Sequence, residues 1–458
     1  MRAGGLERLT DILEALEALA RRGSKTEPEI ATTLHESYRE FFEADFSTFD
    51  VDAVRRQGPA IVDRIFTLYL ALRDQIPVWQ EQGAMSHRVQ VALRDVFRAS
   101  RYARDIVGEI ALGHPRLAKR EVPPEAFAGP DYFTFKNPRF GPGPVELRPG
   151  DIVLQRGMVH NSAAISRIGD VDSQFSHVSI VARDPAGHLV MVEALIGDGS
   201  VVTPLDKALG HGVGRAVLLR HRDIDLASRA AEMIRSAIAR ADGRHEPRIL
   251  YDFSMELGGY RHLYCAKLVR LAFSMASTGA YRIPTFSTRL DMKNRDFIDR
   301  IGVTAVETFA PGDIELEPDF DVVAEWRDFR ITSELRLKDM VMQKLFEWME
   351  RFDYRFQPTF FARLVGRLGA ATAHMPIFMQ RLTTRLAGKV PINMGAKAVA
   401  AVAMLHWTAE ELYEELRALE DKSIRETGRQ LHPRLVLDAL ERMREARGAH
   451  IGYLATDT

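Results

Sequence analysis

The stretch Tyr264-Cys265-Ala266-Lys267-Leu268-Val269 holds the only cysteine of the 458-residue chain. It follows a loop with Gly258 and Gly259, and it opens a run, residues 268–273, whose apolar side chains recur at helical spacing. This pattern places the sulfur at or near a helix N-terminus, where unpaired backbone N–H groups and the helix dipole favour a thiolate. The alternative is that Cys265 is a small buried apolar residue, as most free cysteines are.

A β-rich segment precedes this cysteine. The turn signal Asp184-Pro185-Ala186-Gly187 separates two runs typical of the strands of a hairpin. Further β-runs lie on either side of them, and an amphipathic helix comes before the cysteine helix. This order predicts an α+β domain with a mostly antiparallel sheet. We expect strands at residues 150–155, 175–183, 188–195, 200–203 and 215–220, a helix at 224–241, and a last strand at 320–326 after Pro311-Gly312-Asp313-Ile314.

A histidine and a glutamate stand within the two hairpin strands. If the turn pairs residue 183 with residue 187, His177 and Glu193 face each other directly, with Cβ atoms about 5 Å apart. A slip of one residue would place them on opposite faces of the sheet. Burying an unpaired carboxylate is costly, so Glu193 either has a partner or points to solvent. His177 is correspondingly either a placed base or a packed core residue.

These residue types supply what a thiol nucleophile needs. A thiolate attacks, an imidazole takes and returns the proton, and a third polar group fixes the imidazole tautomer. Short motifs surround the three residues in a fixed order along the chain. They are Gly150-Asp151-Ile152-Val153-Leu154, Phe175-Ser176-His177-Val178, Val192-Glu193-Ala194, Tyr251-Asp252-Phe253 and Tyr264-Cys265-x-x-Leu268-Val269.

The motifs resemble the circularly permuted papain-like cysteine hydrolases of the NlpC superfamily, the YiiX/YebB-like group, over about residues 145–330. Lecithin–retinol acyltransferase enzymes are more distant relatives with the same permuted order. The resemblance implies that Cys265 is the nucleophile, His177 the base and Glu193 the orienting residue. It also implies that Tyr264 is a helper at the oxyanion. The family often has Ser-Glu after its cysteine, whereas this chain has Ala266-Lys267, which puts the substrate contacts in doubt.

Three further polar residues could belong to the site. Ser162 could line the cleft or could be the N-cap of one or two helical turns over residues 162–168. Asp252 could bind substrate, hydrogen-bond the loop before Cys265 or cap a turn. His262 could compete as the base, although a loop histidine lacks the placement that a strand provides.

Helical regions flank the β-rich part on both sides. Residues 1–113 have helical periodicity, and Pro77 is expected to interrupt it between the third and fourth helices. Residues 114–144, punctuated by Pro and Gly, predict an extended connector whose aromatic side chains pack on the next domain or line a cleft. Residues 145–330 form the expected catalytic domain and residues 331–458 a second helical region. In the first region we expect helices over residues 27–44, 51–76 and 86–113.

The totals exclude several classes of protein. Lys and Arg number 62 against 63 Asp and Glu, which gives no overall attraction to nucleic acid. One cysteine excludes a disulfide framework and a cysteine-based zinc site, and His211, His221 and His245 have no metal-ligand spacing. We therefore expect neither a metal nor an organic cofactor. Residues 1–8 lead into a charged helix that lacks the apolar core of a signal peptide. No uncharged stretch reaches the roughly 20 residues of a membrane span. We therefore expect a soluble cytoplasmic protein.

Residues 354–409 contain no acidic residue and are rich in apolar ones. Two segments, 360–368 and 377–386, have the pattern of basic amphipathic helices, which could lie on an anionic membrane. Alternatively, the stretch packs inside a helical domain and pairs with the acidic run that begins at Glu410. Flotation with anionic vesicles at low and physiological salt separates these two interpretations. The basic residues are Arg355, Arg363, Arg367, Arg381, Arg385, Lys389 and Lys397.

The function predicted from these patterns is a cysteine hydrolase or acyltransferase that cleaves an amide or ester bond through a thioester. Its substrate is a small molecule, an acyl compound or a peptide, with lipid-linked or N-acyl compounds as candidates. One alternative is a peptidoglycan amidase or peptidase delivered as a toxin without a signal peptide. Another is a binding or scaffold protein with an idle papain-like core. A reactive thiol would argue for the enzyme, and an inert thiol for the scaffold.

Overall fold

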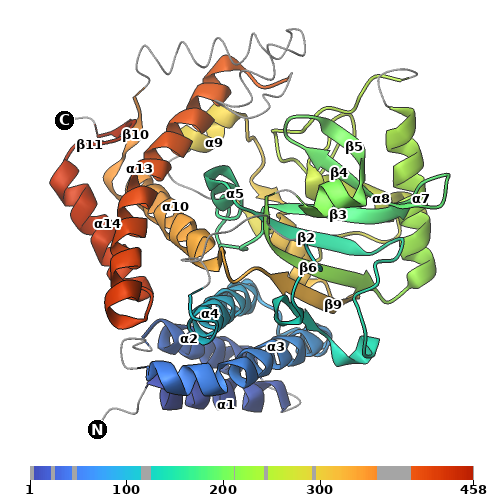
Figure 1. Ribbon diagram of the computed structural model, residues 1–458. Coiled ribbons are helices and arrows are strands. Elements are labelled where there is room, and N and C mark those ends of the chain that lie inside the picture. The colour runs from blue at the N-terminus through green and yellow to red at the C-terminus, as the bar shows by residue number, and fades with distance from the viewer. Residues whose placement is uncertain are drawn as a thin grey trace.

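A computed structural model describes residues 5–21, 26–43, 49–114, 125–210, 212–241, 246–290, 295–357 and 393–456. Figure 1 shows a central sheet with helices of the N-terminal region below it and helices of the C-terminal region beside it. The sheet therefore meets both helical flanks, and the residues that it presents to each of them decide how the parts are joined.

The central sheet has the strand order β1-β9-β6-β2-β3-β4-β5, and all of its neighbouring strands are antiparallel. The predicted α+β fold with a mostly antiparallel sheet is confirmed. The edge strand β1 was not predicted, because three residues within a Pro- and Gly-rich segment show no alternation. The strands are β1 Thr134–Lys136, β2 Ile152–Gly157, β3 His177–Arg183, β4 Leu189–Leu195, β5 Gly199–Pro204, β6 Val213–His221 and β9 Phe320–Arg327.

Two helices, α7 (Ile224–Arg240) and α8 (Cys265–Ala276), pack against β3 and β4 on one face of the sheet. Asp223 caps α7, because its carboxylate accepts the Leu226 N–H at 2.8 Å. The buried face of α8 includes Leu268, Val269 and Phe273, the apolar residues that predicted it. The shorter elements around them are α5 His160–Ile165, α6 Leu205–Gly210, β7 Thr288–Arg289, α9 Asp296–Ile301, β8 Glu307–Thr308 and the 3₁₀ helices η3 Asp131–Phe133, η4 Pro138–Phe140 and η5 Pro311–Leu316.

The N-terminal helices follow the predicted pattern, with one correction at Pro77. The third helix does not end there but continues to Glu81. Ile76 and Trp79 on either side of the proline are buried in the core, so packing offsets the hydrogen bond that proline cannot donate. These helices are α1 Gly5–Arg21, α2 Glu27–Glu43, α3 Val51–Glu81 and α4 His87–Ala111.

The C-terminal region is helical as predicted in its described parts, and it also contains a small three-stranded sheet that was not predicted. Residues 358–392, which carry most of the basic stretch, lie outside the described residues. In the acidic run, Glu410 binds His160 at 2.8 Å, and Glu411 and Glu415 bind Arg447. No helix among the described residues is long and apolar enough to cross a membrane. The elements are α10 Thr332–Phe352, β10 Arg355–Phe356, α13 Ala396–Thr427, α14 Pro433–Arg447, β11 His450–Ile451 and β12 Leu454–Ala455.

A buried ionic layer covers the face of the sheet opposite α7 and α8. Gln155 shares a face of the sheet with His177, the β3 residue directly opposite it. Successive side chains of a strand alternate between faces, so Arg156 lies on the other face. There Arg156 pairs in register with Arg215 of β6, and Arg215 with Arg327 of β9. The sheet therefore presents a row of arginines to the flanking helices.

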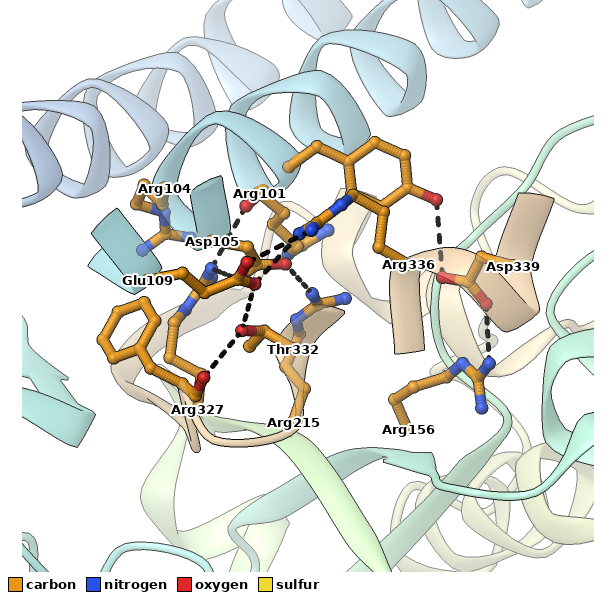
Figure 2. A network of polar contacts seen from close by, with 12 residues as sticks. Arg101, Arg104, Asp105, Glu109, Arg156, Arg215, Arg327, Thr332, Arg336 and Asp339 are labelled. Carbon is orange, nitrogen blue, oxygen red and sulfur yellow. Dashed lines mark hydrogen bonds and ion pairs between the residues drawn. The ribbon is translucent and has the colours of Figure 1, made fainter. Parts of the chain in front are cut away.

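Carboxylates from both helical flanks (Figure 2) and from the sheet itself neutralise this row. Asp105 on α4 accepts from Arg215 at 2.7 Å, and Asp339 on α10 accepts from Arg156 at 2.6 Å. Glu325 on β9 is fully buried and pairs with three guanidinium groups, which belong to Arg101, Arg104 and Arg327. Burial acts to raise the pKa of Glu325, but the arginines around it hold that pKa far below its usual range.

Replacing Glu325 by Gln should destabilise the protein strongly, because the three arginines would keep their charge and lose the carboxylate that they share, while Arg101 keeps Glu315 and Arg327 keeps Asp105. Breaking a buried ion pair in this way costs about 3–5 kcal/mol of unfolding free energy. The measurement is the midpoint of urea unfolding, followed by circular dichroism. Glu232→Gln is the control, because this exposed glutamate pairs with Arg235 on the surface of α7 and should matter by less than about 1 kcal/mol. Equal midpoints for the two variants would contradict the role given to the ionic layer.

Candidate active site

Cys265 is the first residue of α8, as the sequence predicts. Tyr264 is the N-cap, and the first helical hydrogen bond runs from the Leu268 N–H to the Tyr264 carbonyl at 2.9 Å. Within the described residues no side chain caps this helix start. The sulfur therefore lies beside the partly positive end of the helix, where backbone N–H groups favour negative charge. The cysteine is only 4 % exposed.

The hairpin beneath the cysteine has a register different from the one predicted. Arg183 pairs with Leu189 rather than with Gly187. The loop is Pro185-Ala186-Gly187, closed by a bond from the Asp184 N–H to the His188 carbonyl at 2.8 Å. Gly187 has φ +93°, so it takes the left-handed position that ends a three-residue hairpin loop and does not start the next strand. The correction shifts the register by two residues, which leaves every side chain on its predicted face.

His177 and Glu193 therefore share a face, although they are diagonal neighbours rather than a directly opposed pair. Extending the register from Ile180–Val192 places His177 opposite Leu195. The glutamate side chain spans the diagonal, and its Oε2 lies 2.9 Å from His177 Nε2. The Glu193 side chain is 5 % exposed and that of His177 is 19 % exposed. The structure thus gives the buried carboxylate a partner, as its place in an apolar strand requires.

The electrostatics of the pair favour a charged imidazole. Burial acts to lower the pKa of His177, but the neighbouring Cys265 sulfur and the Glu193 carboxylate outweigh it and raise this pKa to about 10. Burial likewise acts to raise the pKa of Glu193, but the hydrogen bond and charge of His177 lower it. At neutral pH the ring is then an imidazolium between a carboxylate and the sulfur, and a cation beside a sulfur stabilises the thiolate.

Tyr264 lies next to the cysteine with its side chain fully buried. Its hydroxyl is 3.0 Å from Thr308 Oγ1, and it accepts the Phe309 N–H at 3.3 Å. These contacts join the start of α8 to the segment around β8. The hydroxyl is therefore already engaged by two partners. The role of Tyr264 at the oxyanion stays a prediction.

Asp252 caps a turn, which was one of its predicted roles. One carboxylate oxygen accepts from the Ser254 N–H at 3.0 Å and from its hydroxyl at 2.6 Å. The other oxygen accepts from Lys267 Nζ at 2.6 Å. Lys267 is 1 % exposed, so this pair is buried and ties the loop before Cys265 to the first turn of α8. The lysine that departs from the family pattern thus has a local partner, which sequence spacing alone did not show.

Two other candidates take different places. The N-cap of α5 is Val159, so the prediction that Ser162 is an N-cap is wrong. Ser162 lies inside α5, close against Gly157 at the end of β2. His262 is exposed in the loop before α8 and has no place in the strand pair that holds the imidazole. Sequence reasoning also missed Gln155, which is buried beside His177 and whose amide donates to the Ala208 carbonyl at 3.1 Å.

This sheet, with a histidine strand preceding a cysteine helix that packs on it, defines a papain-like domain in permuted order. Residues 146–309 match a family model described as permuted papain-like amidase enzyme, YaeF/YiiX, C92 family. No curated protein and no solved structure matches the chain. The predicted resemblance to permuted papain-like enzymes is confirmed for this segment. In the described part of the chain, no group of three or more His, Cys, Asp or Glu side chains could hold a metal ion.

Alkylation by iodoacetamide should report the charge state of the site directly, because Cys265 is the only thiol. The wild-type protein should react at pH 6, well below the pKa of about 8.5 of an ordinary thiol. In His177→Ala the reaction should require a pH near that ordinary value. The rate is followed by intact mass from pH 5 to 10, with Cys265→Ala as the unlabelled control. An unreactive thiol at pH 6 in the folded wild type would contradict the ion pair.

Proposed function

We propose that this protein cleaves an amide or ester bond of an acyl group through a thioester on Cys265. The observation that carries the proposal is the half-buried His177, which is hydrogen-bonded to Glu193 and lies beside Cys265. A scaffold protein has no need of a charged imidazole beside its only thiol. The amidase family matched by residues 146–309 supports the same class of reaction.

The proposed reaction has two halves. The Cys265 thiolate attacks the acyl carbon, and the backbone N–H groups at the start of α8 stabilise the oxyanion that forms. His177 gives its proton to the leaving nitrogen or oxygen, and the thioester remains. In the second half, neutral His177 takes a proton from water or from an acceptor alcohol or amine, which attacks the thioester. The acid or the transferred acyl product leaves, the thiolate returns and His177 is again protonated.

Glu193 has a supporting part in this scheme. Its carboxylate holds one ring nitrogen of His177, so it fixes the orientation of the ring and stabilises the imidazolium. For the substrate we propose a lipid-linked or N-acyl compound. Two considerations support it: the resemblance to acyltransferases, and the basic, apolar composition of residues 354–409, which would suit an anionic lipid surface.

The test is to trap the acyl-enzyme. Wild-type protein is mixed with a panel of activated acyl esters and N-acyl amides of increasing chain length, quenched in acid and weighed intact. One acyl mass should appear on the peptide that carries Cys265. Turnover should fall by about 10³-fold or more in Cys265→Ala. Glu193→Gln should keep partial activity, because its amide oxygen can still accept a hydrogen bond from the ring.

Circular dichroism and thermal midpoints of the variants are the control for folding. Turnover by Cys265→Ala equal to that of the wild type on the same substrate would exclude covalent catalysis through this residue. The chain length that gives the fastest acylation identifies the acyl class, and addition of alcohols or amines separates transfer from hydrolysis.

A further inference from the structure

Strand β5 contributes a polar side chain next to the proposed catalytic pair. In the β4–β5 ladder, Glu193 pairs with Val201 and Met191 pairs with Thr203. Thr203 is two residues from Val201, so it lies on the same face of the sheet as Glu193 and is its diagonal neighbour. Burial acts to raise the pKa of Glu193, and the Thr203 side chain, after His177, acts to lower it. The carboxylate thus lies between His177 on β3, which it contacts, and Thr203 on β5.

The observed register explains why this second contact matters. Because Glu193 is diagonal to His177, its side chain has to extend along the sheet to reach the ring. A glutamate side chain loses rotamer freedom when it is fixed in one conformation, and this loss opposes the extended placement. Threonine is branched at Cβ and has few χ1 rotamers, so its hydroxyl is a rigid donor that can define where the carboxylate lies.

The segment that carries Thr203 also reaches the other neighbour of His177. Helix α6 begins directly after β5, and its Ala208 carbonyl accepts a hydrogen bond from Gln155 Nε2 at 3.1 Å. Gln155 is the β2 partner of His177. Residues 199–210 therefore lie next to both neighbours of His177. Thr203 lies beside the Glu193 carboxylate, and Ala208 accepts a hydrogen bond from the Gln155 amide.

We infer that Thr203 is a positioning residue for the proposed reaction, and that its hydroxyl keeps the Glu193 carboxylate ionised and directed at His177. The inference rests on the proposed function of Cys265, His177 and Glu193. Without the hydroxyl, the carboxylate loses a donor and is freer to rotate, so it stabilises the imidazolium less. At low pH the ion pair of the Cys265 thiolate and the His177 imidazolium is in equilibrium with the neutral thiol and imidazole. Without the hydroxyl, the ion pair is then a smaller fraction of the protein.

Three variants test this inference through alkylation of the single thiol. Thr203→Val keeps the shape of the side chain and removes the hydroxyl, whereas Thr203→Ser keeps the hydroxyl. Val202→Thr makes the reverse change at the adjacent position, on the opposite face of β5, and reports any general weakening of the strand. Each variant is treated with iodoacetamide from pH 5 to 10 and weighed intact.

We expect Thr203→Val to lower the alkylation rate at pH 6 by about 3- to 10-fold, the effect of one lost hydrogen bond to a charged group. At pH 10, where the thiol ionises without help, its rate should equal that of the wild type. Thr203→Ser should restore the rate at pH 6, and Val202→Thr should not change it. A merely structural role for Thr203 would not give a loss confined to low pH.

A His177→Ala arm separates the two possible failures. If His177→Ala shifts the profile while Thr203→Val matches the wild type, the ion pair exists and the inference about Thr203 is wrong. If Thr203→Ser is as slow as Thr203→Val, the hydroxyl is not the active group and the inference is also wrong. If His177→Ala leaves the profile unchanged, the pair itself is absent, and the proposed function fails together with the inference.

Discussion

Every charge that the central sheet takes out of water has to find a partner inside the protein, and this requirement shapes both faces of the sheet. On one face, Glu193 is paired with His177, which also meets Cys265. On the other face, Arg156 and its neighbours are paired with carboxylates of α4, α10 and β9. Gln155 and Arg156 are adjacent in β2, and their side chains lie on opposite faces of the sheet.

The ionic layer explains what the helical flanks contribute. Without Asp105 from α4 and Asp339 from α10, Arg215 and Arg156 of this row would lose the carboxylates that they contact. Arg336 of α10 in turn binds Glu109 of α4 at 3.0 Å, which joins the two flanks to each other. The flanks therefore pack on the face of the sheet opposite the proposed site. Both flanks lie outside the family match, which covers residues 146–309.

The sequence predicted the parts of the fold that local patterns encode. The alternation of the strands, the helix start at Cys265 and the shared face of His177 and Glu193 all depend on neighbours within one element or one hairpin. The exact pairing of the hairpin was wrong by two residues, because Gly187 has a positive φ that places it in the loop and that the sequence pattern did not show. Pro77 was predicted to interrupt the helical structure. Instead the helix continues through it, because the residues around it pack in the core.

The rest could not be predicted, because it depends on contacts between residues far apart in the chain. Arg104 and Glu325 are separated by 221 residues, and nothing in either neighbourhood indicates the other. Lys267 looked like a departure from the family until the structure placed Asp252 beside it. Thr203 lies in a short run without a catalytic motif, and only the register of β4 and β5 relates it to Glu193.

The central claim is that His177 is a protonated imidazole held between Glu193 and Cys265. The most direct test is the titration of its ring by NMR in histidine-labelled protein, with the signal assigned from the spectrum of His177→Gln. The account predicts that His177 in the wild type titrates with a pKa of about 10, and that in Cys265→Ala this pKa falls toward its ordinary value. A wild-type His177 that titrates near the ordinary value of about 6.5, and does not respond to removal of the sulfur, would contradict it.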